Sequence, residues 1–225
     1  MSISLGIYDF FAYIIPGVLY LFVFNESLRI FGLKFVNITL WVQSGQSSSF
    51  LLLIPILIAA YVIGHIIDPL AYNFYHKFIY RLRHKKKIYE KQLQYLKEGF
   101  PKLNIRFDPR DWTILFTLLR ERNIEITKVI DKYQADSMML RNIAFGTLLL
   151  TIAYFGKFFL TFSWIDLAIS LGVLIISLLA INKSNQFRTW FYSAIFEASL
   201  GYGTSLKEVI SYSFRERVMK SKTPK

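Results

Sequence analysis

The chain has 225 residues, and because 54% of them are hydrophobic and 17% aromatic, the composition excludes an ordinary soluble domain and indicates a membrane protein. The formal net charge of +12 favours attraction to anionic lipid headgroups over nucleic acid, since basic residues that flank apolar segments usually serve membrane orientation. The absence of cysteine from the sequence excludes disulfides, thiol nucleophiles and thiolate metal sites.

Four apolar segments are expected to span the membrane as helices. In chain order they are Phe10 to Phe24, Phe50 to Ile67, Ile143 to Phe162 and Ile165 to Ile181. At about 1.5 Å per residue, segments of this size approach the thickness of the hydrocarbon core. The first contains Pro16-Gly17, which predicts a kink whose freed carbonyl is satisfied by neighbouring helices or water. The last two are so close in sequence that they must form a tight antiparallel hairpin around Ser163 and Trp164.

Lys and Arg predict the orientation of these spans. Sixteen of the 27 lie within residues 68–142 and eight within 182–225, whereas residues 25–49 hold two and the hairpin one. The positive-inside rule therefore predicts that both termini and the long middle segment are cytoplasmic, at the inner (plasma) membrane of a cell. No Lys or Arg precedes the first span and no cleavage motif follows it, so we expect that span to remain as an anchor.

The expected fold class is an all-α membrane protein with four transmembrane helices, a cytoplasmic helical insert between spans two and three, and a C-terminal cytoplasmic helical segment. The expected domains are residues 1–67 (spans one and two with an outer loop), 68–142 (a cytoplasmic helical arm), 143–181 (the transmembrane hairpin) and 182–225 (amphipathic helices and a basic tail).

The insert carries a heptad-like apolar seam. From Tyr75 to Phe100 the seam positions recur at alternating spacings of four and three residues, with Lys86 the only break. If the second span continues past Pro69, these residues form one long arm that ends before Pro101. The seam can pack on the helices that return to span three, or it can pair with a second copy. We favour the intramolecular packing.

Two short motifs predict helix N-termini. Asp108-Pro-Arg-Asp111 offers an N-cap followed by Pro in the first turn, and Ser205-Leu-Lys-Glu208 fits a capping box. Apolar residues at helical spacing follow both motifs, so the insert and the C-terminal segment are both expected to be helical.

A basic patch lies within the insert. It consists of Arg81, Arg83, His84, Lys85, Lys86 and Lys87. Such runs neutralise phosphate backbones or acidic headgroups, although a solvated charged face is the simpler interpretation.

A polar cluster is expected where the spans meet the cytoplasm. Asp9, His65, Asp68, Arg141 and Asn142 all fall near the inner ends of spans one, two and three. Ionisable groups at such depths tend to face the bundle interior and to pair. We expect Arg141 to pair with Asp68 rather than Asp9, and a proton or ion gate is the alternative use of the cluster.

Lys157 lies inside the third span. At the bilayer centre a lysine would cost about 2.5–3.5 kcal/mol, so we expect this side chain to snorkel toward the nearby hairpin end.

No segment has the spacing of a catalytic, nucleotide-binding or metal-binding motif. We therefore assign no catalytic residue, no metal site and no cofactor, and an enzyme is the less favoured class.

Two short stretches carry a resemblance to known families. Tyr8-Asp9-Phe10-Phe11-Ala12-Tyr13 followed by Pro16-Gly17 resembles the start of small bacterial membrane proteins. Arg141-Asn142 resembles the Arg-Asn pair of HEPN-type ribonucleases and of HEPN-like CRISPR and phage-defence accessory membrane proteins, which form pores. Gly146, Thr147 and Leu148 stand where that pattern has His, so the resemblance implies a membrane effector rather than a ribonuclease.

The favoured function is that of a non-enzymatic, oligomeric membrane protein that acts through its cytoplasmic helices as an effector or assembly protein. An oligomeric pore gated at the polar cluster is the alternative, and an enzyme acting on RNA or lipid is the third candidate. The expected partners are the anionic lipid bilayer, further copies of the chain and a cytoplasmic protein. Copies would meet through the seam or through the Pro16-Gly17 surface.

Overall fold

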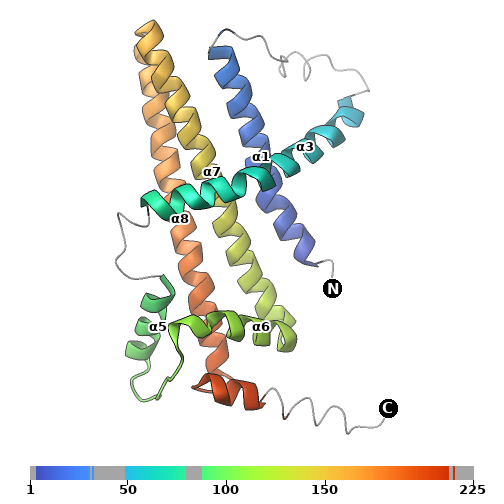
Figure 1. The fold of residues 1–225 in the computed structure, drawn as a ribbon, viewed down its shortest axis with the longest axis vertical. Coiled ribbons are helices and arrows are strands. Elements are labelled where there is room, and N and C mark those ends of the chain that lie inside the picture. The colour runs from blue at the N-terminus through green and yellow to red at the C-terminus, as the bar shows by residue number, and fades with distance from the viewer. Residues whose placement is uncertain (1–3, 31, 33–48, 80–87, 213–214, 216–225) are drawn as a thin grey trace. The chain divides into compact units, whose positions relative to one another are not determined.

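The computed structural model describes residues 4–30, 32, 49–79, 88–212 and 215 (Figure 1). These residues are helical throughout apart from short turns and loops, and no strand occurs among them. The basic patch at residues 81–87 lies outside the described residues. The all-α fold class is confirmed for the part of the chain described.

Four of the described helices are long and apolar enough to cross a membrane. They are α1 (Ser4–Ile30), α3 (Ser49–Phe74), α7 (Ile124–Thr161) and α8 (Trp164–Leu200). Only 17% to 33% of each apolar stretch is buried inside the chain, so most of the apolar surface needs a cover such as lipid tails. Each helix contains one of the four segments expected to span the membrane, except that α7 ends at Thr161, one residue before the expected end of the third span at Phe162. The architecture is compatible with a multi-pass membrane protein.

The last two long helices extend well beyond the apolar segments. α7 begins at Ile124, where the Asn123 side-chain oxygen accepts a hydrogen bond from the Ile126 amide at 3.1 Å. α8 continues to Leu200 and ends at a turn that contains Gly203, whose φ is +152°. The polar parts of these helices, residues 124–142 and 182–200, contain no Pro or Gly. The helical hydrogen bonds of the backbone therefore continue through them without a break.

The hairpin between α7 and α8 is as tight as the sequence predicted. Phe162 and Ser163 alone separate the helices, and Phe162 has a positive φ of 50°. The Ser163 carbonyl accepts a hydrogen bond from the Asp166 amide at 3.0 Å, which closes the first turn of α8. Figure 1 shows the two helices side by side and antiparallel.

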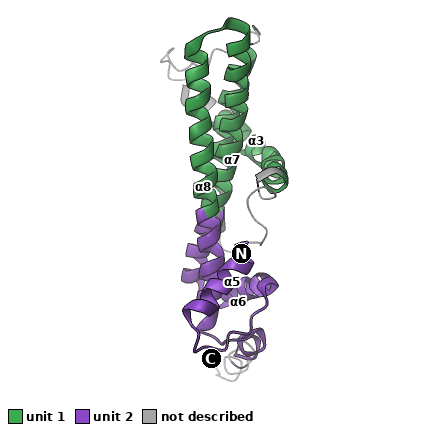
Figure 2. Cartoon of the chain, turned by 90° about the vertical axis from the view of Figure 1, so that its left-hand side faces the viewer, with its two compact units in different colours: residues 1–82, 135–185 green, residues 83–134, 186–225 purple. Residues whose placement is uncertain are grey.

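The chain forms two compact units, and α7 and α8 contribute to both. Unit 1 consists of residues 1–82 and 135–185, and unit 2 of residues 83–134 and 186–225 (Figure 2). Unit 1 therefore holds α1, α3 and the hairpin. Unit 2 holds α5 (Ile88–Gly99), α6 (Trp112–Arg122) and the remaining turns of α7 and α8.

In unit 1, α1 and α3 cross at a glycine on each helix. A Cβ atom added to Gly17 would collide with the Ala60 carbonyl, and one added to Gly64 would collide with the Tyr13 carbonyl. Only glycine permits so close a backbone approach. The expectation that the Pro16-Gly17 surface lies between copies is wrong at Gly17, because α3 of the same chain already occupies this face.

Unit 2 has an apolar core of its own. Its fully buried side chains include Leu115, Leu119, Ile130, Ile195, Phe196 and Val209. Trp112 at the start of α6 makes edge-to-face ring contacts with Phe191 and Tyr192 of α8. Both predicted helix starts are present, since Asp108 and Asp111 form a reciprocal capping box and the Glu208 carboxylate accepts from the amides of Thr204 and Ser205.

Three described positions of the apolar seam, Tyr75, Leu93 and Leu96, are buried within the chain, as the intramolecular alternative predicted, whereas Phe100 at its end is exposed. Tyr75 packs in unit 1, where its hydroxyl donates to the Ile181 carbonyl at 3.1 Å. Leu93 and Leu96 are buried in unit 2, and the neighbouring Tyr89 contacts Tyr192 edge-to-face. α5 thus packs on α8, a helix that was not among its expected partners. The predicted continuity of the arm falls on residues 80–87, outside the described part.

Candidate functional site

The expected ion pair between spans two and three is present. Asp68 lies near the end of α3, and Arg141 and Asn142 are neighbours on α7. One Asp68 oxygen, Oδ1, accepts from Arg141 Nη2 at 2.6 Å and from Asn142 Nδ2 at 2.8 Å. The side chains of Arg141 and Asp68 are only 11% and 17% exposed, so removing either partner leaves a poorly solvated charge.

Two tyrosines extend this polar network. Tyr20 of α1 is buried, and its hydroxyl donates to the backbone carbonyl of Asn142 at 2.7 Å. The Arg141 guanidinium lies 5.2 Å from the ring centre of Tyr72, one turn beyond Asp68 on α3. The network therefore connects α1, α3 and α7. Tyr72 could have been found from its four-residue spacing to Asp68, whereas a bond from Tyr20 to a backbone carbonyl leaves no sequence signal.

The other members of the predicted cluster are placed differently. His65 is exposed and stacks on Tyr13 of α1, with ring centres 3.6 Å apart, and it meets Tyr61 edge-to-face. Its described contacts are with these rings and not with Asp68, because the close crossing at Gly64 brings Tyr13 beside it. Asp9 lies in α1, and its side chain falls outside the described part of the structure.

A second charged pair lies at the hairpin. Lys157 of α7 donates to Asp166 Oδ1 of α8 at 2.7 Å, and Thr161 donates to the other oxygen, Oδ2, at 3.1 Å. The Asp166 side chain is 7% exposed and the Lys157 side chain 33%. Lys157 thus has an acidic partner, whereas the sequence analysis predicted only that its side chain would snorkel. The two residues are nine apart in sequence, and the hairpin places them opposite one another on α7 and α8.

Serine hydroxyls join α7 to α8 at heptad spacing. Ser170, Ser177 and Ser184 donate to the carbonyls of Thr151, Ala144 and Ser137 at 3.1, 2.8 and 2.7 Å. Donors and acceptors each recur every seven residues, the period at which two helices keep facing one another. Small polar residues let membrane helices approach closely and bond across the interface. These serines were not among the predicted site residues, although their seven-residue spacing is visible in the sequence.

The chemistry available in unit 1 is that of helix association. Asp68 and Arg141 neutralise each other, and the described residues contain no group of three His, Asp or Glu side chains that could hold a metal ion. Two buried polar atoms of the network, Arg141 Nε and Asn142 Oδ1, have no hydrogen-bond partner. The network thus holds helices together but presents no activated nucleophile or metal site.

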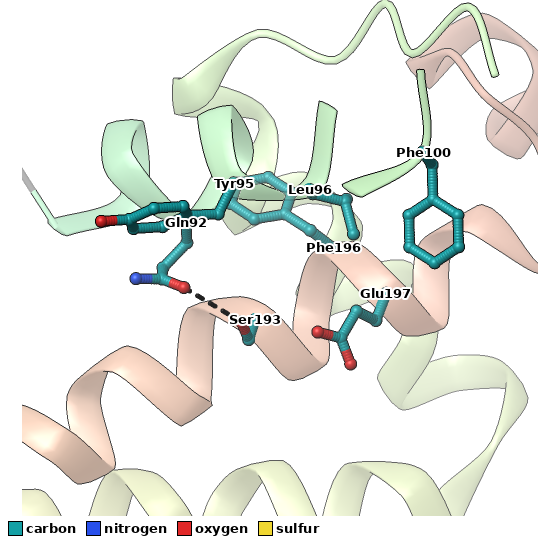
Figure 3. Close-up of a pocket in the computed structure, with 7 residues that line it drawn as sticks. All are labelled: Gln92, Tyr95, Leu96, Phe100, Ser193, Phe196 and Glu197. Carbon is teal, nitrogen blue, oxygen red and sulfur yellow. Dashed lines mark hydrogen bonds between the residues drawn. The ribbon is translucent and has the colours of Figure 1, made fainter. Parts of the chain in front are cut away.

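Unit 2 contains a pocket of about 160 Å³ between α5 and α8 (Figure 3). It is lined by Gln92, Tyr95, Leu96, Phe100, Ser193, Phe196 and Glu197. Ser193 Oγ donates to Gln92 Oε1 at 3.1 Å and ties the two helices together beside the pocket. None of these residues was singled out as a site from the sequence, because each also fits an ordinary amphipathic helix.

Comparisons with protein-family models, with curated proteins and with solved structures found no match to this chain.

Proposed function

We propose that the chain is a non-enzymatic multi-pass membrane protein whose unit 1 is an anchor and whose unit 2 binds a protein partner on the cytoplasmic side. In this role it acts as a membrane effector or assembly protein. The orientation follows from the positions of Lys and Arg, which also favour contact with anionic headgroups next to the spans. The chain would work as an oligomer, through surfaces other than the Gly17 face.

The polar contacts of unit 1 support an anchor rather than an ion gate. A gate requires polar groups that face a water path and change partners. Instead, Asp68, Arg141, Asn142 and Tyr20 bond to one another across three helices of one chain, and the Ser170, Ser177 and Ser184 hydroxyls bond α8 to α7. Contacts of this kind favour one fixed arrangement of the spans.

The observation that carries the proposal is the surface of unit 2. This unit has a buried core, yet it leaves large apolar side chains exposed on several helices. The most exposed of these are Tyr95 and Ile124, each at 63%, followed by Tyr212, Phe100, Val129, Ile114, Ile210 and Leu103. Tyr95 and Phe100 line the same pocket, so part of this surface is contiguous. An apolar patch with polar neighbours is typical of a protein-binding surface.

Site-specific photo-cross-linking in cells tests the proposal. A photoreactive amino acid at Ile114 or Ile210 of unit 2 should give discrete adducts with another protein, identified by mass spectrometry. The same amino acid at Ile66 or Ile175, which are 64% and 58% exposed in unit 1, should give lipid adducts and serves as the matched control. Absence of protein adducts at both unit 2 positions would contradict the proposal. Ion flux through proteoliposomes of the purified chain would also contradict it.

A further inference from the structure

We infer that the pocket between α5 and α8 binds the cationic side chain of an arginine or lysine on the partner protein. The inference rests on the proposed function of unit 2 as a binding unit, and it assigns the chemistry that this unit recognises.

The volume of the pocket limits the size of the chemical group that can bind in it. About 160 Å³ corresponds to roughly five water molecules at their share of about 30 Å³ each in the liquid. Sites for drug-sized ligands and cofactors occupy about 300–1,000 Å³. The pocket therefore fits the end of one long side chain and is too small for a nucleotide or a comparable cofactor.

Aromatic rings supply the first element of recognition. Leu96 and Phe196 are buried and form an apolar floor, whereas the aromatic residues Tyr95 and Phe100 are 63% and 49% exposed. Exposed ring faces attract cations, and arginine also stacks on them through its flat guanidinium group. The methylene groups of the same side chain would cover the apolar floor.

A carboxylate supplies the second element. Glu197 is exposed and lines the pocket, and Figure 3 shows it at the same end of the pocket as Phe100. In a chain with a net charge of +12, no Lys or Arg among the described residues forms an ion pair with this carboxylate. An anionic ligand would be repelled by Glu197, and a purely apolar one would cover a charge without pairing it. A cation is the ligand that can both pair with the carboxylate and interact favourably with the aromatic rings.

The pocket walls are held in place without a ligand. The bond from Ser193 to Gln92 joins α8 to α5, and Leu93 and Leu96 anchor α5 in the core of unit 2. Because the walls are already ordered, little conformational entropy is lost when a side chain enters.

An NMR titration of the full chain in maltoside detergent, which carries no cation, tests the inference. The probe is acetyl-Gly-Arg-Gly-amide, and the control peptide has citrulline, an uncharged side chain of nearly the same shape. The methyl groups of Leu96 report occupancy. The arginine peptide should saturate the signal and bind about fivefold or more tightly than the citrulline peptide, as expected for one ion pair with a cation–π contact.

Two glutamate substitutions locate the effect. Glu197→Gln should abolish the preference for arginine over citrulline. Glu98→Gln removes the same charge from an exposed position of α5 that does not line the pocket, and it should leave the preference unchanged. Equal binding of the two peptides to the unaltered chain would overturn the inference, and so would equal effects of the two substitutions. A stronger shift with phosphocholine than with the arginine peptide would assign the pocket to a lipid headgroup and would also overturn it.

The cross-linking experiment separates this inference from the proposed function. If protein adducts form at Ile114 and Ile210 but the peptide titration fails, unit 2 binds its partner elsewhere. If the adducts are absent, the binding role itself fails, whatever the peptides do.

Discussion

Asp68 and Arg141 are 73 residues apart in sequence, and their side chains meet at 2.6 Å between α3 and α7. The same carboxylate oxygen also accepts from Asn142, so one atom of α3 holds two consecutive residues of α7. The pair is partly buried, and its stability therefore depends on both partners being present.

Arg141→Ala should lower the free energy of unfolding by about 3–5 kcal/mol, because it leaves Asp68 poorly solvated without its counter-charge. Lys128→Ala removes an exposed pair with Glu125 and should cost less than about 1 kcal/mol. Unfolding in detergent, followed by circular dichroism, measures both.

The double variant Asp68→Leu with Arg141→Met should recover part of the lost stability, since an apolar pair removes both charges together but leaves the buried Asn142 amide without its acceptor. A double variant as unstable as Arg141→Ala would show that the pair does more than neutralise two charges.

The Gly17 crossing predicts a large effect of a single methyl group. Gly17→Ala places a Cβ atom against the Ala60 carbonyl and should cost about 1–3 kcal/mol, as the helices must move apart. Gly156→Ala on α7 meets nothing within 4 Å and should leave stability unchanged or raise it slightly. Equal melting temperatures for the two variants would mean that α1 and α3 do not cross here.

The serine contacts between α7 and α8 should contribute modestly and separately. Each of Ser170→Ala, Ser177→Ala and Ser184→Ala removes a bond from a hydroxyl of α8 to a carbonyl of α7 and should cost about 0.6 kcal/mol. Ser184→Ala also removes a 3.3 Å contact with the Ser137 hydroxyl. Ser177→Leu forces a large side chain against Ala144 and should cost several times more. The ranking is checked by unfolding of the four variants under one set of conditions. A Ser177→Leu variant as stable as Ser177→Ala would contradict the close approach.

The contacts of Glu208, which lies outside the expected membrane spans, should make the local stability of this helix start depend on pH. Its pKa is lowered chiefly by the hydrogen bond from the Thr204 amide, followed by the Thr204 hydroxyl and the Ser205 groups. A lowered pKa means that the capping contacts are fully present above the usual pKa of a glutamate and are lost as the pH falls through the folded value. Hydrogen exchange of the Thr204 and Ser205 amides should therefore rise on acidification relative to other amides of unit 2. Glu208→Gln should largely remove this extra pH dependence.

Several features of the fold were predictable because one strong physical effect determines each. Hydropathy located the four apolar helices, and the two residues between α7 and α8 left no alternative to a hairpin. The pairing of Arg141 with Asp68 was predictable because few charges lie near the spans and each needs a partner.

Other features depend on tertiary packing, which the sequence does not encode locally. The contact of α5 with α8 depends on which apolar faces meet in the folded chain, and the spacing of apolar residues within α5 does not identify the helix it packs on. His65 stacks on Tyr13 because Gly64 lets the helices approach, a relation that no spacing within one helix reveals. The bond from Tyr20 to the Asn142 carbonyl is equally nonlocal.

Labelling of single cysteines decides whether the membrane anchor carries unit 2 on the cytoplasmic side. The natural sequence has no cysteine, so Lys97→Cys in unit 2 and Ser163→Cys in the hairpin each provide one reactive site. With a membrane-impermeant maleimide, we predict that intact spheroplasts label Ser163→Cys at once and label Lys97→Cys only after lysis. Labelling of Lys97→Cys in intact spheroplasts would contradict the proposed orientation and, with it, the cytoplasmic binding role of unit 2.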